Sequence, residues 1–369
     1  MKEPLFHIVR KNNTPAWTAW LIRLAAILIA FALVGVLTVF LTGLNPIDVY
    51  VKLFQGCFKS SRKVWKLLQG TSILLCIALA LTPAFKMRFW NTGGEGQVLV
   101  GGLVSAIMMM FLADKLPNYV LIPCMLIAAM LAGAIWGVIP AIFKAKWNTN
   151  ETLFTLMMNY VAIQLVSYFC IQFANPKGSG HIGVLNQKTE IGWLPKLFGQ
   201  NYLFNILIVV AILIFIFVYL KYSKHGYELS VVGESERTAK YIGINVKKVI
   251  IRTMVLSGAI CGIAGFLLVS GTDHTISTET AGGQGFTAIM VSWLAKFNPI
   301  AMVFAAFLII FMKQGADEIT TAFQLNHAYA DILSGIIIFF IIGCEFFINY
   351  RIIFRNQKKK MDTKEVGLK

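Results

Sequence analysis

Long stretches of apolar residues recur along the whole chain, and they constrain its fold more than any other feature. A helix needs about 20 consecutive apolar residues to cross the hydrocarbon core of a bilayer. With 57% hydrophobic and 14% charged residues, the chain also departs from soluble domains, in which roughly 25% of residues are charged. We therefore predict an all-α, polytopic integral membrane protein with about ten transmembrane helices. The apolar blocks lie at about 20–42, 70–85, 97–112, 119–142, 152–173, 202–220, 253–271, 285–296, 299–313 and 328–349.

The distribution of charge predicts how the chain is oriented. The formal net charge is +16, but no recognition helix, zinc finger or aromatic-basic motif accompanies it, so we exclude nucleic acid as a partner. Basic residues gather on the cytoplasmic side of membrane proteins. The N-terminal segment 1–19, the basic loop 221–252 and the basic tail 351–369 are therefore expected in the cytoplasm, around a transmembrane permease domain at 20–350.

Two regions of this topology need comment. Block 20–42 follows basic residues as a signal peptide would, but it is too long and lacks a small-residue cleavage site, so we expect it to be retained as the first span. Residues 45–69 carry five basic residues on the expected external side, against the charge rule. Their apolar spacing predicts a helix that lies along the lipid headgroups while its lysines reach water.

Two glycine-rich sequences interrupt the apolar pattern. The first break is Asn91-Thr92-Gly93-Gly94-Glu95-Gly96-Gln97, and the second is Gly282-Gly283-Gln284-Gly285. Irregular backbone at membrane depth survives only inside protein or beside a water-filled cavity. The spans before the two breaks run in opposite directions in the predicted topology, which is the inverted repeat of transporters. Blocks 70–85, 285–296 and 299–313 are shorter than a full span, as expected of broken or re-entrant helices.

Small residues are spaced for close helix packing in two other spans. Ala129, Gly133 and Gly137 recur every four residues in one, and Gly258 and Gly262 do so in another. Small side chains allow the backbones of membrane helices to approach closely. We interpret both stripes as packing surfaces.

The cytoplasmic loop contains a short helix with clear end signals. Ser235 is a favourable N-cap, Glu236 suits the positive helix start, and Gly243 supplies a left-handed stop. A helix of two turns is unstable alone in water. Either a soluble partner holds it, or it packs back on its own bundle.

The chain lacks the motifs of common catalytic sites. No nucleotide-binding P-loop, H-E-x-x-H or G-x-S-x-G motif is present, so we predict a transport subunit rather than an enzyme, with any ATP hydrolysis on a separate chain. The six cysteines are scattered singly and predict no metal site or cofactor. The histidines of the external loops, His181, His274 and His327, are expected to be solvated.

Ionisable residues within the spans are sparse. Glu95 lies in the first break, and Asp331 and Glu345 lie near the two ends of the last span. A proton or sodium relay would need more such groups, which disfavours a self-contained secondary transporter. We expect Glu95 to cap the helix that follows it.

Four segments resemble the branched-chain amino acid and simple-sugar permease superfamily of ABC importers, and its nucleoside permeases most closely. They are the first break with residues 150–160, the loop 233–245, and residues 257–265. The resemblance runs from about residue 20 to 350. Thr92 stands where relatives usually have isoleucine, and Lys240 stands where a small residue or arginine is common.

The resemblance implies a nucleoside importer in a bacterial plasma membrane that works by alternating access. Its implied partners are a second homologous permease subunit, a cytoplasmic ABC ATPase, an extracellular substrate-binding lipoprotein and membrane lipids. The short cytoplasmic helix would dock into a cleft of the ATPase. The implied coupling residues are Gly233, Glu234, Ser235, Glu236, Arg237, Thr238, Ala239, Lys240, Tyr241 and Gly243.

Residues of both breaks and of one span are the candidates for the substrate pathway. A nucleoside has an aromatic base and a hydroxylated sugar, so amides and flat or soft apolar walls would suit it. The candidates are Trp90, Asn91, Glu95, Gln97, Met158, Asn159, Gln164, Gly282, Gly283, Gln284 and Gly285. Met158, Asn159 and Gln164 do not share one helical face, so at least one should pack against a neighbour.

Three other functions stay open. The first keeps the importer but replaces its cargo with ribose or another simple sugar. The second is the secondary transporter, and the last is an integral membrane enzyme, which lacks a convergent catalytic set.

Overall fold

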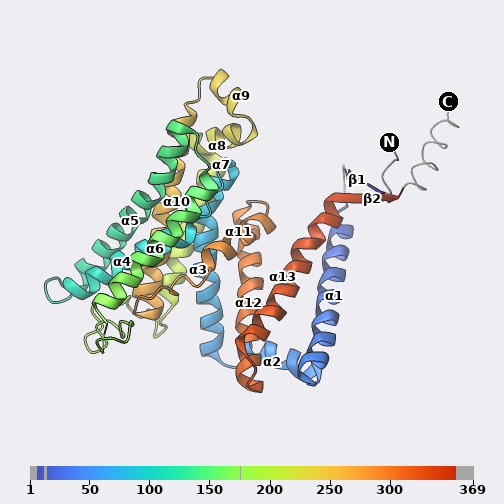
Figure 1. Cartoon of the computed structure of the whole chain (residues 1–369), viewed down its shortest axis with the longest axis horizontal. Coiled ribbons are helices and arrows are strands. Elements are labelled where there is room, and N and C mark those ends of the chain that lie inside the picture. The colour runs from blue at the N-terminus through green and yellow to red at the C-terminus, as the bar shows by residue number, and fades with distance from the viewer. Residues whose placement is uncertain (1–5, 12–14, 175, 355–369) are drawn as a thin grey trace. The chain divides into compact units, whose positions relative to one another are not determined.

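The structure, a computed structural model, describes residues 6–11, 15–174 and 176–354, and helices dominate it (Figure 1). The predicted all-α polytopic fold is confirmed. The predicted N-terminal segment and basic tail lie partly outside the described residues, at 1–5, 12–14 and 355–369. The elements in chain order are β1 (Phe6–Arg10), α1 (Ala16–Thr42), α2 (Pro46–Phe58), α3 (Ser61–Lys86), α4 (Gly94–Phe111), α5 (Asn118–Trp147), α6 (Glu151–Gln172), α7 (Leu203–Tyr222), α8 (Lys224–Glu234), α9 (Glu236–Tyr241), α10 (Val246–Leu268), the π-helix η1 (Val269–Asp273), α11 (Gln284–Leu294), α12 (Pro299–Phe323), α13 (His327–Asn349) and β2 (Tyr350–Phe354).

Within the described part of the chain, nine helices are long and apolar enough to span a membrane. The predicted block that is not among these nine is the eighth, 285–296, which corresponds to α11 and has only 11 residues. An α-helix rises 1.5 Å per residue, so α11 covers about half of the hydrocarbon core. The prediction of a short, broken segment at 285–296 is confirmed.

The two other blocks predicted to be short are full-length helices. α3 has 26 residues and α12 has 25, where the sequence predicted 70–85 and 299–313. Polar residues such as Lys66 and Gln69 in α3, or Lys313 and Gln314 in α12, end the apolar run without ending the helix. Lysine and glutamine are good helix formers, which is the physical reason for both errors.

The chain forms two compact units, residues 61–310 and the combination of residues 1–60 with 311–369. In the larger unit, α10 lies at the centre and packs against α3, α4 and α5. The small-residue stripes make this packing possible. A Cβ atom added to Gly133 would lie 2.2 Å from the carbonyl oxygen of Gly258, and one added to Gly262 would lie 2.1 Å from that of Ala129. The prediction of close helix packing is confirmed.

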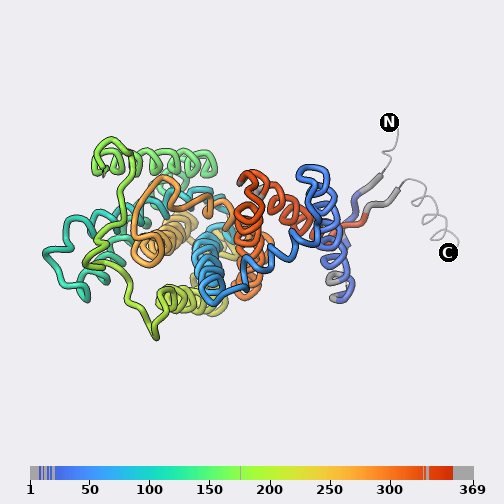
Figure 2. Tube along the Cα trace, turned by 90° about the horizontal axis from the view of Figure 1, so that it is seen from below, coloured from blue at the N-terminus to red at the C-terminus, as the bar shows by residue number. Residues whose placement is uncertain are grey.

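The other helices of the larger unit surround this centre. α6 and α7 lie on opposite sides of the α3–α10 pair (Figure 2). α8 and α9 lie at one end of the bundle, and the connection at 174–202 lies at the other (Figure 1). The unit therefore presents two chemically different ends.

The smaller unit contains α1, α2, α13 and the C-terminal part of α12. α1 packs along α13, and the guanidinium of Arg23 lies 2.7 Å from the carboxylate of Glu345. The predicted helix at 45–69 is divided between α2 and the start of α3. α2 buries Leu53 and Cys57 within its unit and exposes apolar side chains such as Phe54. Its position along the lipid headgroups stays a prediction.

β1 and β2 pair antiparallel, with Phe6 opposite Phe354 and Arg10 opposite Tyr350. This pairing brings the two ends of the described chain side by side.

Candidate functional site

The first break connects α3 to α4 through residues 87–93, and its side chains are tied to α10. Asn91 is completely buried, and its Nδ2 donates to the hydroxyl of Ser257 at 3.1 Å. The amides of Asn91 and Gln97 also bond to each other, at 3.3 and 3.4 Å. Buried amides must be satisfied in this way, because an unpaired buried polar group costs about 1 to 3 kcal/mol. Both predicted pathway amides thus bind protein groups.

Asn159 ties the same break to α6. Its Oδ1 accepts from the backbone amide of Gly96 at 2.9 Å, and its Nδ2 donates to the carbonyl of Thr92 at 2.9 Å. The hydroxyls of Thr92 and Thr155 lie 2.9 Å apart. Thr92 therefore contributes to the contact with α6 through both its carbonyl and its hydroxyl.

The second break follows the π-helix η1 that ends α10. The chain passes through residues 274–283 without regular structure, and the Sγ of Cys170 in α6 donates to the carbonyl of Ile276 at 3.4 Å. Gly282 and Gly283 have φ angles of +55° and +72°, which favour glycine. α11 begins directly afterwards. Ile276, Thr280 and Ala281 of this segment are buried, whereas Glu279 and Gly282 are exposed.

The two breaks meet at Glu95, which is buried in the first turn of α4. Its Oε1 accepts from the backbone amide of Gly283 at 2.8 Å, and its Oε2 accepts from that of Gly285 at 2.7 Å. The sequence predicted that Glu95 caps its own helix. The structure places Glu95 in the first turn of α4, but its two carboxylate oxygens cap α11 instead.

Four aromatic side chains form a cluster beside the first break. The rings of Trp90 and Trp293 stack with centroids 5.4 Å apart, and Phe85 contacts both edge-on at 5.9 and 6.5 Å. Phe297 completes the cluster against Trp293. Trp90 and Trp293 keep 44% and 47% of their surface exposed, so the cluster presents flat aromatic area outward.

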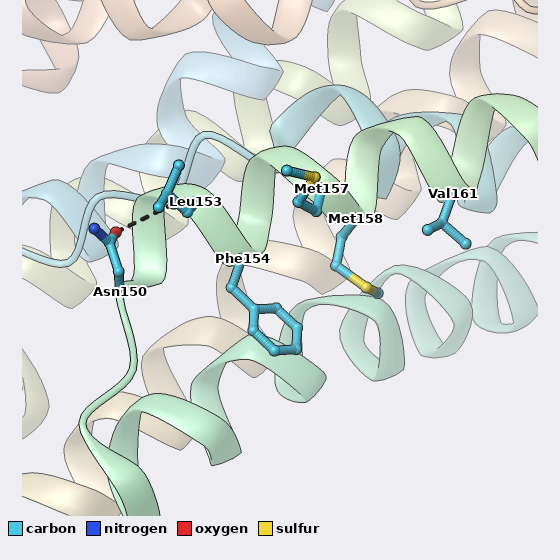
Figure 3. A pocket seen from close by; sticks show the side chains of 6 residues that line it. All are labelled: Asn150, Leu153, Phe154, Met157, Met158 and Val161. Atoms are coloured by element: carbon cyan, nitrogen blue, oxygen red, sulfur yellow. Dashed lines mark hydrogen bonds between the residues drawn. The ribbon is translucent and has the colours of Figure 1, made fainter.

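A groove of about 420 Å³ runs along α6 and contains the predicted residue Met158. Phe154, Met158 and Val161 project from the same side of α6 toward the neighbouring helix (Figure 3). Gln164 lies one turn beyond Tyr160 and is exposed, whereas Asn159 is buried. The expectation that these α6 residues do not share one face is confirmed. The structure therefore gathers the other predicted pathway residues at the meeting point of the breaks and leaves Met158 and Gln164 on the α6 surface.

The predicted cytoplasmic helix is α9, and its end signals are as expected. The hydroxyl of Ser235 accepts from the amide of Thr238 at 3.2 Å, and Gly243 has a φ of +85°. Tyr241 is 92% exposed and Ile242 is 50% exposed, although Ala239 is buried. α9 thus combines an anchored side with an uncovered apolar surface.

α8 connects this helix to the first break. A Cβ atom on Gly233, near the end of α8, would lie 2.2 Å from the carbonyl oxygen of Lys86, the last residue of α3. A pair between Arg252 and Glu228, at 2.9 Å, holds α8 against α10. α8 therefore touches the last residue of α3 directly.

Next to the connection at 174–202, one residue differs from its prediction. His274 was expected to be solvated, but its ring stacks on Trp193 with centroids 3.7 Å apart and planes 7° from parallel. Burial lowers the pKa of His274 below its ordinary value, because the charged form loses water, and Lys196 acts in the same direction. Nearby Glu190 opposes the shift. Aromatic stacking outweighs hydration at this site.

No group of three or more histidine, cysteine, aspartate or glutamate side chains among the described residues is arranged to hold a metal ion. The buried polar groups described above use protein partners. These hydrogen bonds tie the two breaks to each other and to α6 and α10.

A comparison with known protein families shows where this chain belongs. The model of the branched-chain amino acid transport system permease component matches residues 64–342. The chain belongs to this family. It is an ABC permease and a multi-pass membrane protein, and the match covers both breaks and the cytoplasmic loop.

Individual ABC permeases are similar over almost the whole chain. A guanosine ABC transporter permease of Bacillus subtilis is 30% identical over 87% of this chain and 92% of its own length. A nucleoside ABC transporter permease of Lactococcus lactis is 29% identical over 87% and 90%. A glucose ABC transporter permease of Haloferax volcanii is 28% identical over 93% and 92%. No solved structure matches.

Sequence reasoning missed the partners that hold the candidate residues in this ABC permease. Trp293, Ser257 and Thr155 were not among the predicted site residues, yet they contact Trp90, Asn91 and Thr92 respectively. Ser257 and Thr155 carried a weak signal, since they lie in the segments 257–265 and 150–160 that resemble the permease superfamily. Trp293 carried none, because its contact with Trp90 joins positions far apart in the chain.

Proposed function

We propose that this ABC permease moves nucleosides into the cell by alternating access, with two inverted broken segments that control a path near the middle of the bilayer. The observation that carries the proposal is the meeting of the two breaks, where Glu95 of one segment bonds to Gly283 and Gly285 of the other. Discontinuous helices in corresponding positions of two halves are typical of transporter binding regions.

The nucleoside cargo is supported by the relatives and by the exposed side chains. Two of the similar permeases are named for guanosine and for nucleosides. The indole ring of Trp90 offers an aromatic face, and the thioether of Met158 offers a polarizable group. Both suit a nucleobase. Gln164 adds an exposed amide for a sugar hydroxyl. In this proposal Asn91, Gln97 and Asn159 shape the path, while the exposed residues touch the substrate.

The proposed importer includes three partner proteins. A second homologous permease would complete the path, a substrate-binding lipoprotein would deliver the nucleoside outside, and an ABC ATPase would dock at α9. The exposed side chains of Tyr241 and Ile242 give that ATPase an apolar surface to cover. The basic loop around α9 favours a cytoplasmic position in a bacterial plasma membrane, with both termini on that side.

The contact between Gly233 and Lys86 supports a route for coupling. α8 meets the end of α3 without an intervening side chain, so closure of the ATPase around α9 would move Lys86 and the break that follows. The residues 233–243 then act as a unit that transmits force, with Gly233 as the point of contact.

A simple sugar is the second candidate cargo. The glucose permease of Haloferax volcanii covers more of this chain than either nucleoside permease does, at similar identity. Amides and aromatic faces also suit a sugar ring, so the site chemistry does not separate the two cargoes.

Co-purification followed by an ATPase assay tests the proposal. The tagged chain, extracted from its host in mild detergent, should retain an ATPase and a second permease in fixed proportion. After reconstitution with the binding lipoprotein, nucleosides should stimulate ATP hydrolysis more than ribose or glucose does. Stimulation by glucose alone would support the sugar reading instead. Recovery of the chain alone, active with an ion gradient, would contradict the ABC importer proposal.

A further inference from the structure

We propose that Glu95 is a positioning residue that fixes α11 to the first break, so that the two breaks move as one body during transport. The claim that the two breaks move together during transport rests on the proposed function. The claim that Glu95 holds the N-terminus of α11 does not depend on it. Glu95 thereby controls where the second break lies, through its hydrogen bonds to that break.

The start of α11 cannot cap itself. The first amides of any helix lack partners inside the helix and need an external acceptor. The N-cap residue of α11 is Gly283, which has no side chain to supply one. Glu95 satisfies two of these amides with its two carboxylate oxygens, at 2.8 and 2.7 Å.

The carboxylate also lies where two helix dipoles favour it. Glu95 belongs to the first turn of α4 and contacts the first turn of α11. A negative charge is stabilised at a helix N-terminus, and charge-assisted hydrogen bonds are stronger than neutral ones. One buried side chain is therefore shared by the two short helices that follow the breaks.

Close backbone contact makes the junction specific. A Cβ atom on Gly285 would lie 2.4 Å from the backbone nitrogen of Glu95. Gly285 therefore allows the two helix starts to touch. At the opposite end of α11, Trp293 stacks on Trp90, which directly precedes the first break sequence. α11 is thus held at both ends by residues of the same segment.

The junction at Glu95 extends the proposed coupling route that begins at α9. Gly233 of α8 meets Lys86, and residues 87–90 connect Lys86 to the first break. A displacement that arrives at Lys86 can reach the second break through Glu95 and Trp90. Without the carboxylate, the first break would move while α11 lags behind.

Hydrogen exchange of the purified full-length chain in nanodiscs tests the structural part without any substrate. Glu95→Ala should speed exchange in peptides that cover residues 282–294 about tenfold, because two charge-assisted bonds are lost. Glu95→Gln keeps one acceptor oxygen and should give a smaller increase. The matched control is Glu151→Gln, which removes a carboxylate from the first turn of α6 and its 2.9 Å contact with Lys144, and should leave these peptides unchanged.

Uptake kinetics in the assembled importer test the functional part. The probe is radiolabelled uridine, or glucose if the wild type prefers the hexose. Glu95→Ala should lower the maximal rate about tenfold and leave the apparent KM within twofold, with partial rescue by Glu95→Gln. Exchange in α5 peptides, unchanged from the wild type, shows that the variants are folded.

Three results would overturn the proposal. Unchanged exchange at residues 282–294 would show that Glu95 does not hold α11. Faster exchange with normal uptake would reduce Glu95 to a local cap. A raised KM with an unchanged maximal rate would make it a substrate contact. If the wild type carries neither probe, the proposed cargo fails, whereas the exchange comparison still decides whether Glu95 holds α11.

Discussion

Trp90 and Trp293 lie with their ring planes 22° apart and their centroids separated by 5.4 Å, which joins the first break to the end of α11. Stacked aromatic pairs contribute about 0.5 to 1.5 kcal/mol beyond the area they bury. Both rings are also partly exposed, so the pair combines a structural contact with a surface available to other molecules.

The tryptophan pair should show energetic coupling. We expect Trp90→Leu and Trp293→Leu each to lower the thermal midpoint of the chain in detergent, and the double variant to lower it by less than their sum. The difference should correspond to about 1 kcal/mol, because the second substitution finds the stack already lost. Additive effects would show that the rings do not stabilise each other.

Gly233→Ala should separate ATP hydrolysis from transport. Its methyl group would meet the carbonyl of Lys86 at 2.2 Å and push α8 away from α3. We expect uptake by the assembled importer to fall at least tenfold while the ATPase stays bound and active. Gly335→Ala is the control, because Gly335 lies in α13, outside the coupling segment, and no atom lies within 4 Å of an added Cβ. Equal uptake in both variants would refute the coupling route.

Gly258→Ala should destabilise the larger unit. The added methyl group would lie 2.2 Å from the carbonyl of Gly133, where α5 and α10 touch. Overpacking of this kind costs about 1 to 3 kcal/mol, so the thermal midpoint should fall. Gly343→Ala in α13 serves as the matched control, since nothing lies within 4 Å of its added Cβ. Similar midpoints for the two variants would contradict the close approach.

The connection at 174–202 should loosen in acid because of His274. Burial lowers its pKa in the folded chain, so folding favours the neutral ring. The contribution to stability is fully present above the unfolded pKa of about 6.5 and is lost as the pH falls below that value and through the lowered folded pKa. We expect the thermal midpoint to fall from pH 7 to pH 5 in the wild type.

His274→Asn is the matching variant for this pH series. Asparagine tolerates the φ of +52° at this position but has no proton to gain in this range. Its midpoint should therefore change less than that of the wild type between pH 7 and pH 5. Identical pH profiles would show that His274 does not report the folding of this connection.

The sequence predicted the helical fold, the short segment α11 and the capped helix α9 because each depends on local information. Apolar blocks, glycine pairs and the Ser235 cap can each be recognised from neighbouring residues. The starts of α3 and the end of α12 were missed because helix formers such as Lys66 continue a helix after its apolar run has ended.

The candidate site was predictable only in part. Glu95 and Gly283 were both recognised as unusual, but their mutual contact joins residues 188 positions apart. Trp293 lacked any local signal because it resembles other aromatic residues of membrane helices. A single sequence holds no record of which distant residues meet, so the ties around the first break emerged only in three dimensions.

The smaller unit is built from the two extremes of the chain. α1 packs along α13, and Arg23 of the first helix pairs with Glu345 of the last. During synthesis, α1 enters the bilayer long before its partner exists, and its arginine must wait for the entire remaining chain to be made. A chain that stops before α13 would lack Glu345, so Arg23 would lose the carboxylate that pairs with it in the folded protein. The smaller unit can therefore assemble only when synthesis is almost finished.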